Sequence, residues 1–170
     1  MRRCGRAGPV AWLTGLPSAG KTTLGRRAVA RLRRAGVAAL LLDSDEARRA
    51  LGRPPGRGPA ERDAFYLALA RLAALLAAQG FPVVVAATAP SRRHRARARA
   101  RCPRFLEVHV ATGAEACARR DPKRLWAGAR AGRVRGLPGA GAAYQPPRRP
   151  GLVARGGHDR RALAALVAWL

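Results

Sequence analysis

Residues 15–23 of the chain read Gly15-Leu16-Pro17-Ser18-Ala19-Gly20-Lys21-Thr22-Thr23. This run matches the phosphate-binding pattern G-x-x-x-x-G-K-[ST] at every specified position. Glycines in such a loop let backbone N–H groups close around phosphate oxygens, and the start of the following helix adds a partial positive charge. The whole run is therefore predicted to bind the phosphates of ATP. A Gly-rich turn that binds nothing is the alternative.

The segments on either side of this loop have the character that the pattern requires. Val10–Thr14 is apolar and β-prone, and Leu24–Arg34 carries apolar residues at helical spacing. The loop thus joins a strand to a helix, which favours phosphate binding over a plain turn. In that setting Lys21 reaches the β and γ phosphates, and the Thr22 hydroxyl ligates Mg²⁺.

Lysine is rare in this chain. Only Lys21 and Lys123 are lysines among 34 Lys and Arg residues. A compact ammonium fits a phosphate loop in which a planar guanidinium would not. A role in this loop therefore explains why position 21 is lysine in a chain that uses arginine almost everywhere else. Lys123 is singled out less strongly, because two lysines have to fall somewhere.

Length, composition and charge limit the function classes. The 170 residues, 48% of them hydrophobic, predict one domain over residues 1–170. The formal net charge of +25 first suggests a polyanionic partner. The arginines are spread over the whole length, however, and 5% aromatic residues offer little surface for stacking bases. Weak nonspecific polyanion binding is expected, and a specific nucleic-acid partner is not.

The cysteines and the apolar segments indicate a compartment. Cys4, Cys102 and Cys117 are widely separated and form no C-x-x-C pair, so they predict neither a zinc site nor a disulfide framework. No stretch approaches the ~20 apolar residues of a membrane span, and the start of the chain reads as a first strand, not a signal peptide. A cytoplasmic protein without a membrane partner is expected. The sequence leaves the oligomeric state open, with a homodimer as one option.

Apolar runs and helical segments alternate after the loop. The predicted elements are strands at residues 37–43, 81–87 and 105–110 and helices at 45–51, 60–79 and 113–120. This alternation favours a parallel sheet covered on both faces. The predicted fold class is α/β, a three-layer α/β/α P-loop NTPase fold with a mainly parallel sheet of about five strands.

The second half of the chain is rich in Arg, Gly and Pro. Ser91–Arg101 is strongly basic, and most of its arginines are expected to face solvent. Residues 121–135 are predicted to be helical, and 136–150 to form a loop, so that 121–150 together make a lid. An amphipathic helix at 158–170 is predicted to pack on the sheet.

The acidic residues narrow the class of P-loop protein. Such an enzyme needs a carboxylate near Mg²⁺ or the attacking hydroxyl. The strand at 81–87 ends without one, whereas the strand at 37–43 ends in Asp43 and is followed by Asp45. This arrangement is typical of small-molecule kinases. Asp45 is the candidate catalytic carboxylate; a role as cap of the helix at 45–51 is compatible with it.

The chain resembles the adenylylsulfate kinase family, which phosphorylates the 3′-hydroxyl of adenylylsulfate with MgATP. The similarity covers residues 10 to about 150. The matching motifs are Trp12-Leu13-Thr14-Gly15-Leu16, Leu42-Asp43-Ser44-Asp45 with Arg48, Arg62, Ala89-Pro90-Ser91-Arg92 with Arg95, Arg120-Asp121-Pro122-Lys123-Arg124-Leu125-Trp126 with Ala129-Arg130-Ala131-Gly132, and Gly139 with Tyr144.

This resemblance implies roles for several of the matched residues. Lys21 and its loop would hold ATP, and Asp45 would orient or deprotonate the acceptor hydroxyl. Asp43 would support a metal-bound water beside Thr22. The residues implied to bind the acceptor are Arg48, Arg62, Arg92 and Lys123, with Arg95 near the phosphosulfate group.

Some motif positions depart from the family. Arg57 replaces a phenylalanine that stacks on the substrate adenine, and Leu137 replaces a phenylalanine of the lid. Phe65 replaces a substrate-binding asparagine, and Ala89 stands where a serine is sometimes assigned a phosphoenzyme role. Two alternatives therefore stay open: phosphoryl transfer to another small hydroxyl compound, and nucleotide binding without turnover.

Overall fold

A parallel β-sheet forms the centre of the computed structural model, which describes residues 7–51 and 58–170. Its strand order is β2-β3-β1-β4-β7, and each neighbouring pair is parallel. The predicted parallel sheet of about five strands is therefore confirmed. The strands are β1 (Val10–Thr14), β2 (Leu40–Asp43), β3 (Val83–Ala86), β4 (Phe105–Val110) and β7 (Leu152–Ala154).

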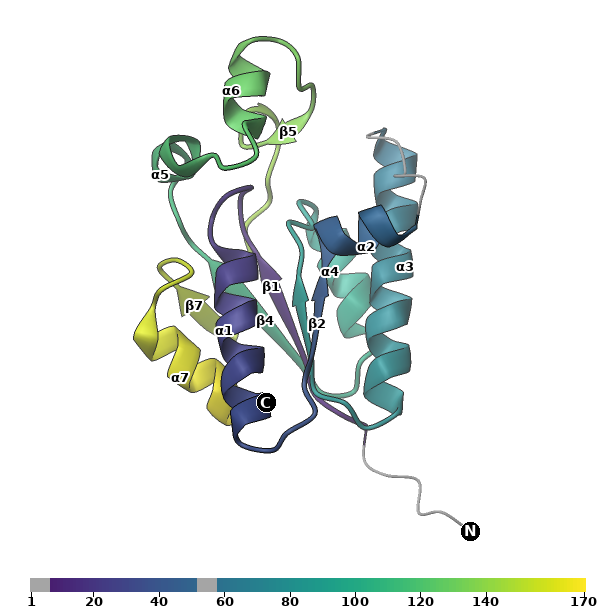
Figure 1. The fold of residues 1–170 in the computed structure, drawn as a ribbon. Coiled ribbons are helices and arrows are strands. Elements are labelled where there is room, and N and C mark those ends of the chain that lie inside the picture. Colours follow the sequence, from purple (N-terminus) through teal and green to yellow (C-terminus); the bar gives the residue numbers. More distant parts are fainter. Residues whose placement is uncertain (1–6, 52–57) are drawn as a thin grey trace.

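Helices cover both faces of this sheet, which makes three layers (Figure 1). Side chains of β1 alternate between two cores, so that Leu13 packs into one and Trp12 into the other. All of β1 is buried, as its continuous apolar run predicts. The helices are α1 (Lys21–Arg34) with α7 (Arg160–Trp169) on one face, and α3 (Pro59–Ala78) with α4 (Arg92–Arg99) on the other.

Four elements were not predicted from the sequence: α4, β7 and the two-residue strands β5 and β6, which lie in the segment predicted to be a loop. Helix α4 lies inside the basic segment Ser91–Arg101, whose few apolar residues gave no amphipathic pattern; it is anchored by His94, Arg95 and Ala98. Strand β7 is apolar but only three residues long, shorter than the runs of about four to eight residues by which strands are recognised in a sequence. It pairs with β4 as the fifth strand.

The lid stands beyond the carboxyl edge of the sheet (Figure 1). Its helix is shorter than predicted, because α6 spans Leu125–Arg130 within the expected 121–135. Asp121 fixes its start by accepting hydrogen bonds from the N–H groups of Leu125 and Ala127. The remaining elements are α2 (Ser44–Ala50), α5 (Ala114–Arg120), β5 (Leu137–Pro138) and β6 (Gly141–Ala142).

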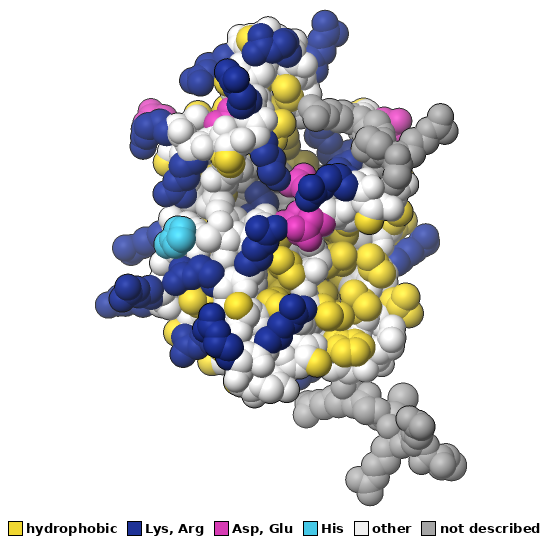
Figure 2. Space-filling model, in the orientation of Figure 1, with side chains coloured by type: hydrophobic (Ala, Val, Ile, Leu, Met, Phe, Trp, Pro, Cys, Tyr) yellow, Lys and Arg dark blue, Asp and Glu magenta, His cyan; other side chains and the backbone are white. Residues whose placement is uncertain are grey.

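Basic side chains are spread over the molecule. Figure 2 shows Lys and Arg over the lid as well as over α1 and α7, as the even distribution along the sequence predicts. Within the described residues, no helix combines the length and apolar character needed to cross a bilayer.

Candidate active site

The loop at residues 15–20 turns sharply between β1 and α1. Gly20 has a φ of 102°, and a Cβ on it would lie 2.5 Å from the backbone nitrogen of Gly157. Only glycine satisfies both restrictions, because the backbone lies in the left-handed region and a neighbouring chain touches it. The loop lines a cavity of about 430 Å³ together with Thr22, Thr23 and Asp45.

Lys21 is buried and turned back on its own loop. Its Nζ donates hydrogen bonds to the carbonyl oxygens of Gly15 at 3.0 Å and Leu16 at 2.7 Å. Burial lowers the pKa of Lys21 to about 8, although the charge of Asp45 acts in the opposite direction. The site thus holds a desolvated ammonium group, which a bound anion such as a phosphate would stabilise strongly.

ATP binding is expected to take up protons above about pH 8. The pKa of Lys21 is about 8 in the free protein, and phosphate oxygens beside the ammonium raise it. At pH 9 binding therefore draws about one proton from solution, whereas at pH 7 Lys21 is already charged and draws almost none. Calorimetry in two buffers of different ionisation enthalpy measures this number. Equal binding heats in both buffers at pH 9 would contradict the lowered pKa.

Asp43 links the loop to α2. Its Oδ2 accepts a hydrogen bond from the Thr22 hydroxyl at 2.6 Å, and its Oδ1 accepts from the N–H of Asp45 at 2.8 Å. Asp43 is therefore the N-cap of α2. The suggestion that Asp45 caps this helix is wrong, and its carboxylate is available for other work.

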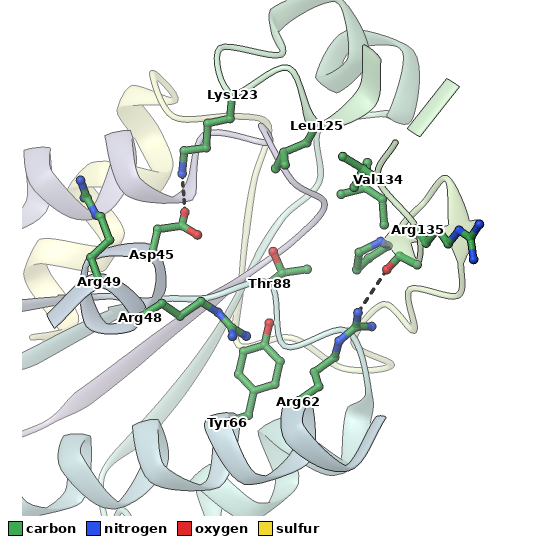
Figure 3. Close-up of a pocket in the computed structure, with 13 residues that line it drawn as sticks. Asp45, Arg48, Arg49, Arg62, Tyr66, Thr88, Lys123, Leu125, Val134 and Arg135 are labelled. Atoms are coloured by element: carbon green, nitrogen blue, oxygen red, sulfur yellow. Dashed lines mark hydrogen bonds and ion pairs between the residues drawn. The ribbon is translucent and has the colours of Figure 1, made fainter. Parts of the chain in front are cut away.

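Asp45 forms an ion pair with Lys123 across the space between α2 and the lid (Figure 3). Both side chains are 54% exposed. The pair brings together the candidate catalytic carboxylate and the second of the two lysines, from positions 78 residues apart in the sequence.

A second cavity, of about 530 Å³, shares part of its wall with the first. Figure 3 shows the residues that line the second cavity. Its wall is cationic, with Asp45 as the one acid among the described residues that line it. The two cavities share the side chains of Asp45, Arg48, Tyr66, Thr88, Lys123 and Leu125. The basic residues that line the second cavity are Arg48, Arg49, Arg62, Lys123 and Arg135.

Three of the residues predicted to bind the acceptor meet in this cavity: Arg48, Arg62 and Lys123. Arg62 also donates a hydrogen bond to the carbonyl oxygen of Gly136 in the lid at 3.2 Å. Arg92 is not among the described residues that line either cavity, and its Nε donates to the carbonyl oxygen of Pro146 at 2.9 Å.

Arg95 is buried and links several parts of the fold. It is 2% exposed and donates to Glu107 Oε1 and to the carbonyl oxygens of Ala89 and Gln145, each at 2.6 Å. These bonds join α4 to β4, to the segment after β3 and to Gln145 of the lid, so the implied place of Arg95 near a phosphosulfate group is wrong.

Sequence reasoning missed Tyr66 and Thr88, which line both cavities. Burial raises the pKa of the Tyr66 phenol. Thr88 follows β3 at the carboxyl edge of the sheet, where parallel sheets place their ligands, so the strand prediction itself could have identified it. Tyr66 lies in an apolar helix and carried no such signal.

The positions that depart from the family have different surroundings. Phe65 is buried in α3, and the guanidinium of Arg48 lies 3.6 Å from the centre of its ring. Leu137 lines the second cavity, whereas Ala89 is buried. Arg57 lies outside the described residues.

The lid packs on the phosphate loop. Trp126 donates its indole N–H to the carbonyl oxygen of Pro17 at 3.2 Å. Gly139 has a φ of 89°, and a Cβ on it would lie 2.7 Å from Leu16 Cδ2 and 3.0 Å from the Trp126 ring. The lid therefore approaches the loop closely.

Gly139→Ala is expected to destabilise the protein by about 3 kcal/mol, because it adds a steric clash to backbone strain. The matched control is Gly132→Ala, which has a similar φ of 70° but meets nothing within 4 Å. It should cost about 1 kcal/mol. Urea unfolding measures both losses, and equal losses would contradict the close packing of Gly139 on Leu16.

Known proteins resemble this chain over most of its length. A family model described as adenylylsulphate kinase matches residues 7–155. An adenylyl-sulfate kinase of Paraburkholderia xenovorans is 40% identical over 141 residues, covering 82% of this chain and 79% of the relative. One of a Synechococcus species is 36% identical over 151 residues, covering 89% and 86%.

A solved structure has the same fold. The APS kinase CysC of Mycobacterium tuberculosis, in complex with AMPPNP and APS, superposes with a TM-score of 0.89 at 34% identity, covering 96% of this chain and 99% of that one. This match confirms the three-layer P-loop fold. The chain belongs to the adenylylsulfate kinase family.

Proposed function

We propose that this protein transfers the γ-phosphoryl group of ATP to the 3′-hydroxyl of adenylylsulfate. The observation that carries the proposal is the position of Asp45, on the boundary between the phosphate-loop cavity and the cationic cavity. A carboxylate at that boundary can reach an acceptor hydroxyl that faces a bound nucleotide. The solved M. tuberculosis relative holds AMPPNP and APS together, which supports the assignment of two adjoining ligands.

Each part of the site then has a chemical task. The loop amides hold the phosphates, and Lys21 exchanges the carbonyl oxygens of Gly15 and Leu16 for phosphate oxygens. Asp45 orients the 3′-hydroxyl and accepts its proton as the oxygen bonds to the γ phosphorus. The bond from that phosphorus to the β–γ bridging oxygen breaks, and ADP leaves.

The acceptor is held by charge. Arg48, Arg62 and Lys123 line the second cavity and suit the phosphosulfate anion. Arg92 stays a proposal as a substrate contact; it would have to leave the carbonyl oxygen of Pro146 to reach an acceptor in the cavity.

Mg²⁺ fits the residues present. The Thr22 hydroxyl and the Asp43 carboxylate lie 2.6 Å apart and are oxygen donors, which Mg²⁺ prefers. No group of three or more His, Cys, Asp and Glu side chains in residues 7–51 and 58–170 could hold a metal ion. Thr22 and Asp43 would therefore bind the ion together with water and phosphate oxygens, and the bound ion would neutralise phosphate charge.

We also propose a single domain acting in the cytoplasm. Cys102 and Cys117 are buried, free thiols, which suits a reducing compartment. A homodimer stays a prediction, and sedimentation analysis tests it.

The deciding experiment incubates the purified protein with MgATP and adenylylsulfate. Formation of the 3′-phosphorylated product is expected. The same assay with a panel of other hydroxyl compounds tests the second candidate function, which the replacements at Phe65 and Leu137 favour. ATP binding without transfer to any acceptor would overturn both in favour of a nucleotide-binding protein.

A further inference from the structure

Helix α2 carries Asp45 and Arg48 but has little packing of its own. All of α2 lies within the described residues, and none of its side chains is buried. Contacts through side chains tie it to three other parts of the fold. Glu46 pairs with Arg26 of α1 at 2.7 Å, Asp45 pairs with Lys123 of the lid, and Arg48 lies over Phe65 of α3.

The contact of Arg48 with Phe65 differs from the other two. Both ion pairs join exposed side chains, and such pairs contribute little to stability. Phe65 is 4% exposed and packs in the second core, with the Tyr66 ring edge-on at 5.4 Å. Its ring is therefore a fixed surface, on which Arg48 lies at 3.6 Å from the centroid.

A ring also holds the guanidinium without neutralising it. A carboxylate in the same place would cancel the charge of Arg48, whereas an aromatic face attracts the cation and carries no net charge. Arg48 lines both cavities. Contact with the ring limits the conformations of Arg48, so its side chain loses less conformational entropy when an anionic acceptor binds.

We propose that Phe65 is a positioning residue, which holds Arg48 in place for the anionic group of the acceptor and steadies the helix that carries Asp45. This inference rests on the proposed function, because the acceptor it concerns is adenylylsulfate. It gives Phe65 a task different from that of a polar side chain, which would contact the substrate directly.

The test is a double-mutant cycle on the KM for adenylylsulfate. Phe65→Leu keeps an apolar side chain but removes the ring, and should raise this KM about five- to thirty-fold, the factor for 1–2 kcal/mol. The KM for ATP should stay unchanged. In an Arg48→Met background, Phe65→Leu should raise the KM no further. An equal rise in both backgrounds would overturn the proposal, because Phe65 would then act without Arg48.

Two further variants keep the test decisive. Phe65→Met removes the ring with a flexible side chain that fills the gap, in case the leucine variant does not fold. Phe105→Leu is the matched control: Arg99 lies over that ring at 4.8 Å, away from both cavities, so its loss should leave the KM for adenylylsulfate unchanged.

Failure of the proposed function is separable from failure of this inference. If the unaltered protein does not phosphorylate adenylylsulfate, the proposed function fails. The same cycle is then measured by urea unfolding, where Phe65→Leu should shift the midpoint less in the Arg48→Met background. Equal shifts in the two backgrounds would overturn the contact itself.

Discussion

Lys21→Met is expected to lower kcat/KM for ATP by about 10³-fold or more, the loss typical of removing a charged donor from developing negative charge. Lys21 is buried at the phosphate loop, and its Nζ donates hydrogen bonds to two carbonyl oxygens of the loop. Methionine has a similar length but cannot donate to a phosphate oxygen. Steady-state kinetics and nucleotide titration measure the loss.

The same substitution is expected to stabilise the free protein at pH 7. The pKa of Lys21 is about 8 in the folded state, below its ordinary 10.5, so charging it costs folding free energy. This cost is fully present below pH 8 and disappears as the pH rises from 8 to 10.5, because only the unfolded chain then keeps the proton. Methionine should therefore add about 2 kcal/mol at pH 7 and less at pH 10.

The control for both effects is Arg31→Met, which removes an exposed cation from the same helix. It should change neither the kinetics nor the pH dependence of unfolding. If the Lys21→Met protein is inactive but no more stable than the unaltered chain at pH 7, then keeping Lys21 charged in the folded protein does not lower its stability.

The phosphate side of the site could be predicted from the sequence because its determinants are local. The run at residues 15–23 specifies both a backbone path and the groups that line it. Asp43 at the end of β2 and Asp45 just beyond it follow the same logic, since the end of a parallel strand places them at the edge of the sheet. The structure brings Thr22 and Asp43 within 2.6 Å, as that logic predicts.

The acceptor side was less predictable, because its geometry depends on contacts between distant segments. Arg95 matched a motif, yet Glu107 and two carbonyl oxygens take up its guanidinium in the core. Tyr66 had no motif and nevertheless lines both cavities. A residue type at a motif position indicates chemistry, but packing decides which way the side chain points.

Phe65 is a second residue whose task could not be predicted from its motif position. In the sequence it is a departure from a substrate-binding asparagine, which suggests a damaged site. In the structure it is the surface on which Arg48 lies. No local pattern relates residues 48 and 65, since they come from two helices whose relative position is fixed by the sheet.

Asp45→Asn is expected to lower kcat by about 10²- to 10⁴-fold while leaving ATP affinity nearly unchanged. Asparagine keeps the size of the side chain and can still accept a hydrogen bond from Lys123, but it cannot accept the proton of the acceptor hydroxyl. The fold near Asp45 should survive, because Asp43 caps α2 and the Asp45 side chain is 54% exposed. Single-turnover phosphoryl transfer measures the chemical step directly.

The matched control is Glu46→Gln, one residue further along α2. Glu46 also pairs with a cation on a neighbouring element, Arg26, at 2.7 Å, so its replacement likewise removes one carboxylate and one ion pair. Its kcat should be unchanged because Glu46 lines neither cavity. Equal losses in the two variants would mean that α2 needs its ion pairs, not the base at Asp45.

Lys123→Met tests one remaining explanation, that Asp45 matters only because it pairs with Lys123. If Asp45 mattered only as the partner of Lys123, removing either residue would lower kcat equally. If Asp45 takes the proton and Lys123 binds the anionic acceptor, Lys123→Met should raise the KM for adenylylsulfate and lower kcat much less than Asp45→Asn does. The split between KM and kcat in these two variants therefore distinguishes a latch between α2 and the lid from a base with an anion-binding neighbour.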